Sequence, residues 1–169
     1  MKKDRWIPII FVLTFILSFI FASLSNLAAS MDVLFIVIGL LLFILIGIIF
    51  DMIGVAVLAA DEATFHAKAS RKIRGARECI NLIKNSNRAS SVCNDVIGDI
   101  CGIVSGTLTA SLVVMLLDTP LMAIFLTAIV SSLTVGGKAI GKKIAIKKSE
   151  NIVFFVGKVL YFFEIHKNK

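Results

Sequence analysis

The sequence predicts an all-α, polytopic helical membrane protein with about four transmembrane helices and additional interfacial helices. The 169 residues are 58% hydrophobic and only 17% charged, whereas an ordinary soluble domain is about half apolar and a quarter charged. The apolar residues gather in four long runs, each near the roughly 20 residues that a membrane-spanning helix needs. The basic residues lie outside these runs, as the flanks of membrane helices require.

Basic residues also set the expected orientation. Lys and Arg are confined to residues 2–5, 68–88 and 138–169, and basic segments that flank membrane helices stay in the cytoplasm. An even number of spans then places both termini there and leaves residues 30–32 and 118–119 as the outer connections. We expect a multi-pass protein of the cell (plasma) membrane that contacts anionic lipid. The same flanking role accounts for the net charge of +7, so we expect no nucleic-acid partner.

The first span is expected over residues 6–29. Pro8 lies in its first turn, where a missing N–H group costs little. The basic start, and residues 27–30, which loosely resemble a small-residue cleavage site, also suit a secretory signal peptide. The apolar stretch over residues 7–22 exceeds the roughly 7 to 15 residues usual for a signal peptide, which favours an uncleaved signal anchor.

The second span is expected to begin at Val33. Its 18 uncharged residues end at Phe50, after about 27 Å of helix, and Asp51 follows near the cytoplasmic boundary. Because small and apolar residues continue to Ala60, the whole segment is longer than one straight crossing needs. We expect a break near Asp51 or Gly54, followed by a short helix sunk in the inner leaflet.

Residues 62–85 have apolar side chains at three- and four-residue steps among basic residues. This pattern predicts an amphipathic helix or helix pair along the inner membrane surface. Residues 85–87 are expected to end it, and Ser90 or Ser91 is expected to cap the next helix. That helix, the third span, should run from Val92 to about Leu117.

The third span carries the main functional signal. Asp95 and Asp99 lie four residues apart and so share one helical face, and Asn94 lies beside them. Carboxylates inside a membrane are functional candidates by default. Small residues at four-residue steps on this helix would admit another helix at close range: Gly98, Gly102 and Gly106.

The fourth span is expected to start at Pro120, a favoured first helical residue, and to end near Gly137. Residues 138–148 then form a basic interfacial segment. Residues 151–165 are too short to span the membrane and rich in aromatic residues, which predicts an interfacial helix with aromatic anchors; a dimer-contact helix is the alternative. The expected units are the anchor at 1–29, the membrane domain at 30–148 and the carboxyl-terminal helix and tail at 149–169.

Asp51 approaches the inner half of the membrane from the second span and so completes a candidate metal site with Asp95, Asp99 and Asn94. Oxygen ligands of this kind suit a hard cation such as Mg²⁺, which binds one or two carboxylates and keeps several waters. Asp95 and Asp99 would be the principal ligands, Asn94 a neutral ligand and Asp51 a counter-charge or gate. Sodium or a proton would suit the same oxygens. In a purely structural alternative, one Asp is protonated and the others hydrogen-bond across the bundle or reach the interface.

Other chemistry has no support in the sequence. It contains no Gly-rich phosphate loop, nucleophile elbow or HExxH motif, so we expect no enzyme. The three cysteines lack CxxC spacing and are expected to be packing residues, and the two histidines are isolated. The cysteines and histidines are Cys79, Cys93, Cys101, His66 and His166.

Residues 54–106 resemble the transmembrane domain of the cyclin M (CNNM) and CorB/CorC magnesium-transporter family. The resemblance extends over roughly residues 33–148 and rests on AADEAT at 59–64, SRKIRGAR at 70–77, LIKN at 82–85 and a Ser/Asn-rich start of the next span. It implies three spans with an outer amino terminus, short helices in the inner leaflet, a juxtamembrane helix, a homodimer and cytoplasmic nucleotide-binding CBS domains. Residues 6–29 would then be an additional anchor.

The chain departs from two motifs of that family. The family's Ser-x-x-Glu pattern has Ala59 in place of Ser before Glu62, and its Gly-Asn-Thr-x-x-Asn pattern is matched most nearly by residues 94–99, where Asp replaces both Asn. In the family, that Ser and the Asn residues contribute to the cation site. The site in this chain is therefore expected to be more acidic with altered ion choice, or no longer the same site. Because the chain ends at Lys169, we expect nucleotide regulation to require a separate cytoplasmic subunit.

Two hypotheses follow. In the first, a homodimer binds and moves a divalent cation, Mg²⁺ above all, through the intramembrane acidic site. In the second, the chain is a non-transporting scaffold or regulatory subunit whose basic loop and tail dock a soluble partner or anionic lipid. The residues expected to carry the second role are Lys142, Lys143, Lys147 and Lys148.

Overall fold

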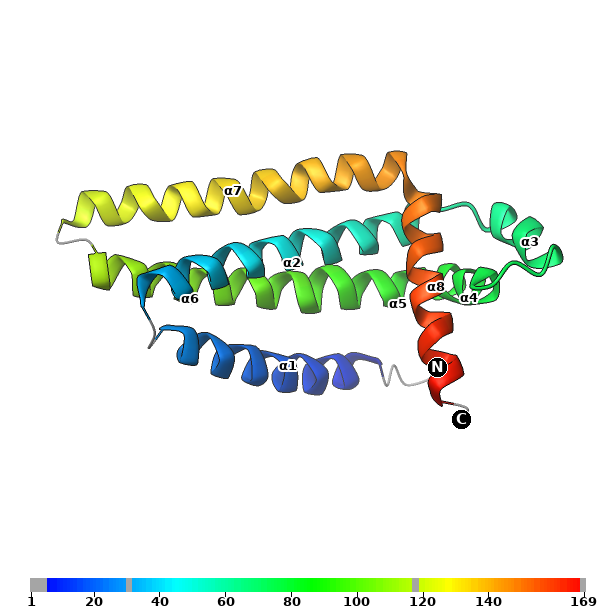
Figure 1. The fold of residues 1–169 in the computed structure, drawn as a ribbon, viewed down its shortest axis with the longest axis horizontal. Helices are drawn as coiled ribbons and strands as arrows, with labels where there is room; N and C mark the ends of the chain where they lie inside the picture. The colour runs from blue at the N-terminus through cyan, green and yellow to red at the C-terminus, as the bar shows by residue number, and fades with distance from the viewer. Residues whose placement is uncertain (1–5, 30–31, 117–118, 168–169) are drawn as a thin grey trace.

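The fold is an assembly of helices, and the computed structural model describes residues 6–29, 32–116 and 119–167 of it. No strand occurs within those ranges. The long helices lie side by side, while α3, α4 and α8 gather at one end (Figure 1). In chain order the elements are α1 Trp6–Ala29, α2 Val33–Ala59, α3 Glu62–Ser70, α4 Ala76–Lys84, α5 Ser86–Ser91, the π-helix η1 Val92–Gly98, α6 Asp99–Leu116, α7 Pro120–Lys147 and α8 Ser149–Lys167.

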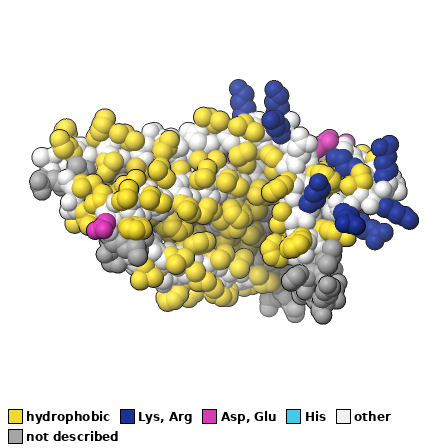
Figure 2. All heavy atoms as spheres, in the orientation of Figure 1, with side chains coloured by type: hydrophobic (Ala, Val, Ile, Leu, Met, Phe, Trp, Pro, Cys, Tyr) yellow, Lys and Arg dark blue, Asp and Glu magenta, His cyan; other side chains and the backbone are white. Residues whose placement is uncertain are grey.

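Among the residues that the structure describes, four segments have the length and apolar composition needed to cross a membrane. They are Trp6–Leu27, Val33–Ala59, Ser86–Leu116 and Pro120–Lys147. On the face shown in Figure 2, hydrophobic side chains cover the long part of the molecule, and Lys and Arg gather at the end that carries α3, α4 and α8. The predicted class, an all-α polytopic membrane protein, is confirmed.

The main core lies between α2 and α6. Side chains of α2 at three- and four-residue steps face the apolar side of α6, as expected of two helices that pack along their length. The buried members are Ile36, Leu40 and Ile44 of α2, Val96 of η1, and Ile100, Val104, Leu108 and Leu112 of α6. This contact fixes which faces of α2 and η1 meet farther along the same interface.

The predicted break in α2 is wrong, because the helix is continuous from Val33 to Ala59. Its 27 residues correspond to about 40 Å of helix, which exceeds the roughly 30 Å hydrocarbon core. The excess is used in packing, since Ala56 and Val57 are buried in a second cluster with Phe65 of α3 and Val153 of α8. Asp51 is tolerated within the helix because it is buried beside a lysine of α7.

Residues 62–84 form the expected helix pair, α3 and α4. The turn between them needs two left-handed residues, Lys72 at φ 56° and Gly75 at φ 86°. Gly75 is the natural residue for that conformation, since it has no Cβ. The helix expected for residues 151–165 is α8, which packs on α4 through the second cluster.

Two helix ends differ from the sequence predictions. The third span begins at Ser86 rather than at Ser90 or Ser91, because Ala89 N–H already donates to Asn85 C=O at 3.0 Å. Ser90 lies inside the helix and accepts a bond from Asn94 instead of capping. The fourth span does not end near residue 137: α7 continues through most of the expected interfacial segment, with Ala145 fully buried.

Helix α1 packs as a fourth helix against α6 and α2. Ser25 and Thr107 share a hydrogen bond of 3.0 Å between their hydroxyl oxygens, and Phe21 and Phe43 form an edge-to-face pair with centroids 5.7 Å apart. At its other end the Trp6 ring lies 5.1 Å from the Arg88 guanidinium carbon. These contacts place the start of α1 at the end of the bundle that carries α5.

Candidate cation site

The candidate site lies where α2 meets η1. Gly47, Asp51 and Gly54 are all buried and recur at four- and three-residue steps, so they form one stripe of α2. A Cβ at Gly47 would lie 3.1 Å from Cys101 Cβ and 3.8 Å from Gly98 O, and a Cβ at Gly54 would overlap the Asn94 side chain. Asp51, only 3% exposed, therefore lies between the levels of Gly98 and Asn94.

Residues Val92–Gly98 adopt a π-helix, which has one extra residue in the turn. Such segments occur within α-helices, frequently at functional sites. In this one, Asn94 Nδ2 donates to Ser90 Oγ at 3.1 Å, and Asn94 Oδ1 is buried without a hydrogen-bond partner. A buried oxygen of this kind costs free energy unless another group satisfies it.

Helix α7 closes the site from the other side. A Cβ at Gly137 or Gly141 would overlap or crowd Ile48 and Met52, so the two glycines let α7 approach α2 closely. The residue after each glycine is a lysine: Lys138 Nζ donates to Gly98 O at 3.2 Å, and Lys142 Nζ lies 3.5 Å from Asp51 Oδ2.

We call these oxygens the α2–η1 site: Asp51 Oδ2, Asn94 Oδ1, Ser90 Oγ and Gly98 O. Asp51 Oδ2 and Asn94 Oδ1 are the two buried side-chain polar atoms without a hydrogen-bond partner in the described part of the chain. The site thus combines one carboxylate and neutral oxygens, which are ligands that hard cations prefer, with two lysine ammonium groups beside them.

The four residues predicted from the sequence do not come together as one cluster. Asp51 and Asn94 lie at the same interface, whereas Asp95 and Asp99 are exposed. Within the described ranges, no group of three or more His, Cys, Asp or Glu side chains is placed to hold a metal ion. The sequence leaves open whether Asp51 faces Asp95 and Asp99; the structure buries Asp51 and leaves the other two exposed.

Sequence reasoning missed Ser90, the Gly98 carbonyl and the site role of the two lysines. It assigned Lys142 to a free docking surface, although Lys142 pairs with Asp51. The repeat of Gly-Lys at 137–138 and 141–142 was the available signal, since it puts two close-packing glycines and two lysines at helical spacing.

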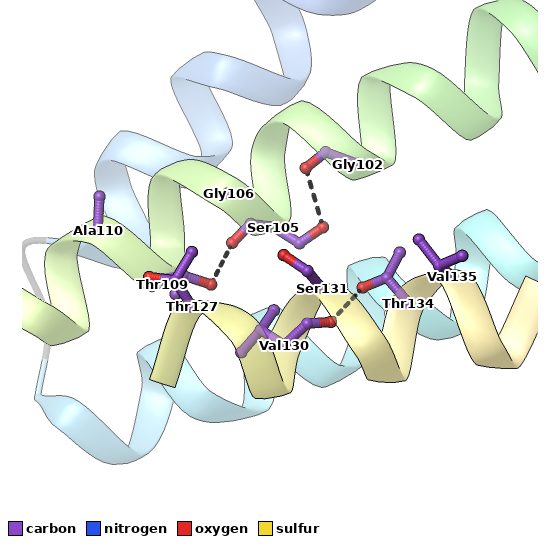
Figure 3. Close-up of a pocket in the computed structure, with 10 residues that line it drawn as sticks. All are labelled: Gly102, Ser105, Gly106, Thr109, Ala110, Thr127, Val130, Ser131, Thr134 and Val135. Carbon is purple, nitrogen blue, oxygen red and sulfur yellow. Dashed lines mark hydrogen bonds between the residues drawn. The ribbon is translucent and has the colours of Figure 1, made fainter. Parts of the chain in front are cut away.

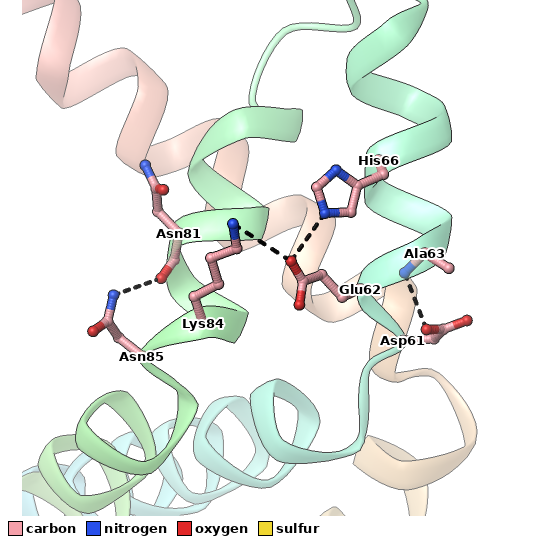
Figure 4. A network of polar contacts seen from close by, with 7 residues as sticks. All are labelled: Asp61, Glu62, Ala63, His66, Asn81, Lys84 and Asn85. Atoms are coloured by element: carbon pink, nitrogen blue, oxygen red, sulfur yellow. Dashed lines mark hydrogen bonds and ion pairs between the residues drawn. The ribbon is translucent and has the colours of Figure 1, made fainter.

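Glu62, the acidic residue of the family motif, belongs to a different network. The Glu62 carboxylate lies 2.9 Å from His66 Nε2 and 3.8 Å from Lys84 Nζ, and Figure 4 shows it between these two groups. Asp61 caps α3, with Oδ1 accepting from Ala63 N–H at 3.0 Å. These contacts join α3 to α4 and start α3, which agrees with a helix-start role for this acidic pair.

A groove between α6 and α7 is lined by small and hydroxyl residues (Figure 3) and has a volume of about 290 Å³. Hydroxyls of the groove donate to carbonyl groups of their own helices: Ser105 to Cys101 O, Thr109 to Ser105 O and Thr134 to Val130 O. Their protons are thus used within each helix. The groove therefore suits helix packing, as the small residues of membrane helices usually do.

Cys79 of α4 is fully buried beneath α8, and its thiol donates to Val153 O at 3.3 Å. Burial, reinforced by Glu78, raises the pKa of the Cys79 thiol from the usual 9.0 to about 11. At neutral pH the thiolate fraction is therefore lower by a factor of about 100.

We expect Cys79 in the folded protein to react with a maleimide far more slowly than the same thiol after unfolding in denaturant. Mass spectrometry of time points between pH 7 and 9 measures both rates. Because the folded pKa is raised, the stability that the neutral thiol contributes is present below pH 9 and is lost as the pH rises through about 11. Equal rates in folded and unfolded protein would contradict the burial of Cys79.

The fold and the site define a polytopic helical membrane protein with buried, unsatisfied oxygens between two of its membrane helices. Residues 37–166, more than three quarters of the chain, match the family described as the Cyclin M transmembrane N-terminal domain. The chain belongs to this family, a family of membrane proteins related to divalent-cation transport. Comparisons with curated proteins and with solved structures give no match. The matched residues begin within α2 and leave out α1.

Proposed function

We propose that the chain binds a divalent cation, Mg²⁺ in the first place, at the α2–η1 site and moves it across the cell membrane. One observation carries the proposal: Asp51 Oδ2 and Asn94 Oδ1 are both buried and lack hydrogen-bond partners at one helix interface. A carboxylate with neutral oxygens and retained waters is a donor set that Mg²⁺ accepts. Family membership supports transport of a divalent cation.

The ligand roles differ from those expected from the sequence. Asp51 becomes the charged ligand, with Asn94 and Ser90 as neutral ligands. Asp95 and Asp99 are exposed, and an exposed carboxylate requires water, lipid head groups or a partner protein around it. We propose that Asp95 and Asp99 supply negative charge at the approach to the site and do not bind the cation directly.

The proposal includes the cellular setting. Both termini lie in the cytoplasm of a cell-membrane protein, since basic residues gather at the end with α3, α4 and α8. Two copies form a homodimer, for which Gly102 and Gly106 in the α6–α7 groove offer close helix contact.

The test is thermal unfolding of the purified protein in detergent across a Mg²⁺ titration. A ligand that binds the native state stabilises it by about 2.7 kcal/mol at roughly 100 times Kd. We expect Mg²⁺ to stabilise the wild type in a saturable manner. Asp51→Asn should lower the Mg²⁺ affinity at least about tenfold, equivalent to about 1.4 kcal/mol of binding free energy. Asp95→Asn and Asp99→Asn should weaken it less. Mg²⁺ uptake by vesicles that contain the protein then distinguishes transport from binding.

Asp32→Asn is the matched control. Asp32 lies at the other end of α2, is exposed, and makes no capping hydrogen bond with its side chain. Asp32→Asn removes one negative charge at the start of the same helix, so the Mg²⁺ response of this variant should equal that of the wild type. If the wild type and every variant show no response at millimolar Mg²⁺, the scaffold function is favoured, with the exposed Lys143, Lys147 and Lys148 as its docking residues.

A further inference from the structure

Two lysine ammonium groups already lie against the oxygens of the α2–η1 site. Lys142 Nζ is 3.5 Å from Asp51 Oδ2, and Lys138 Nζ donates to Gly98 O at 3.2 Å. The two residues are four apart and therefore lie on one face of α7. The protein's own ammonium groups thus place positive charge beside oxygens of the site.

The Asp51–Lys142 pair is asymmetric. The Asp51 side chain is 5% exposed and the Lys142 side chain is 50% exposed, so the carboxylate is held in the interior while half of the lysine side chain lies at the protein surface. Lys142 forms an ion pair with Asp51 Oδ2, but this oxygen accepts no hydrogen bond. A lysine has a flexible four-carbon stem and a strongly hydrated head, so its ammonium can move into water while the carboxylate stays in place.

We propose that Lys142 is a tethered counter-ion of the site: its ammonium neutralises Asp51 in the resting protein, and a divalent cation binds by displacing that ammonium into solvent. This inference rests on the proposed function. It follows that the protein's own charge lowers the apparent affinity for the cation, because only the fraction with Lys142 displaced is competent to bind.

The experiment compares Mg²⁺ titrations of the full chain in detergent, with thermal stability as the readout, for the wild type and three variants. Lys142→Gln removes the tethered charge, Lys142→Arg retains it, and Lys143→Gln removes a neighbouring charge from an exposed residue. We expect Lys142→Gln to lower the Mg²⁺ midpoint by about tenfold or more. Lys143→Gln should stay within about twofold of the wild type, and Lys142→Arg, whose guanidinium is less hydrated and pairs more firmly with a carboxylate, should have a midpoint at or above that of the wild type.

Each outcome decides a different question. If the wild type binds Mg²⁺ and the Mg²⁺ midpoint of Lys142→Gln equals that of Lys143→Gln, the role of Lys142 as a tethered counter-ion is overturned. The proposed cation site is then still supported. If only Lys142→Gln binds, the tether is supported and strong enough to mask the site in the wild type. If neither the wild type nor Lys142→Gln binds, the proposed function fails and the tether with it.

A second measurement uses the unmodified sequence, so it holds even if a variant fails to fold. Acetylation of lysines with an amine-reactive ester, read by mass spectrometry, reports how free each ammonium is. Saturating Mg²⁺ should increase the rate at Lys142 severalfold and leave Lys143 unchanged. A Lys142 rate that Mg²⁺ leaves unchanged or lowers, while Mg²⁺ still stabilises the protein, would overturn the tether.

Discussion

Gly54→Ala is expected to abolish the saturable Mg²⁺ response while leaving the protein folded. A single methyl group at this residue would overlap the Asn94 side chain, which must then leave its place against α2. Because the overlapped atoms belong to a side chain and not to backbone, the cost in folding free energy should stay near the low end of about 1–3 kcal/mol. The loss of Mg²⁺ binding free energy should be larger than this loss of folding free energy, because the site loses the ligand Asn94 Oδ1 and a methyl group takes its place.

Gly136→Ala is the matched control for Gly54→Ala. Gly136 is also a helical glycine in a membrane span, and a Cβ there meets nothing within 4 Å. The same methyl group should leave the Mg²⁺ midpoint unchanged and increase stability slightly, since Ala is favoured over Gly within helices by about 0.5–1 kcal/mol. An intact Mg²⁺ response in Gly54→Ala would show that Asn94 is not a ligand in this arrangement.

Gly157→Ala is expected to lower the free energy of unfolding by about 2–3 kcal/mol, a larger loss of stability than Gly54→Ala should cause. A Cβ at Gly157 would overlap Cys79 Sγ and lie 2.8 Å from Gly75 O and 3.3 Å from Cys79 N. Backbone atoms of α4 and of the turn before it cannot move aside as a side chain can. Helix α8 must therefore separate from α4, and the second cluster opens.

Thermal unfolding and maleimide labelling of Cys79 check this prediction together. Separation of α8 exposes the thiol, so labelling should accelerate in Gly157→Ala under conditions where the wild type is protected. Gly136→Ala serves as the control, because a Cβ at Gly136 meets nothing within 4 Å. Wild-type stability and labelling in Gly157→Ala would mean that α8 does not pack on α4 as closely as the structure has it.

Much of the fold could be predicted because the signals are local. The apolar run over residues 33–59 and the basic residues after it predict a membrane helix and its flank, whatever the rest of the chain does. Helix ends were predicted less well. The sequence marks Asp51 and Gly54 as interruptions, yet both are buried in a continuous helix, because each is matched by a group from another helix.

The candidate site could be predicted only in part. Asn94, Asp95 and Asp99 follow one another closely, so a regular helix was the natural basis for grouping them. The π-helix over Val92–Gly98 buries the oxygen of Asn94 against α2 and leaves Asp95 and Asp99 exposed. An insertion of one residue in a turn arises from packing against other helices and has no clear signature in composition.

The sequence by itself determined the class of protein, the spans and the family, since apolar length, charge placement and motif order are properties of the chain read along its length. Only the tertiary structure decided that Asp51 meets Lys142 and that Asn94 meets Gly54. Those pairs are far apart along the chain. Whether they touch depends on how each helix is rotated about its axis and how closely glycines let the helices approach.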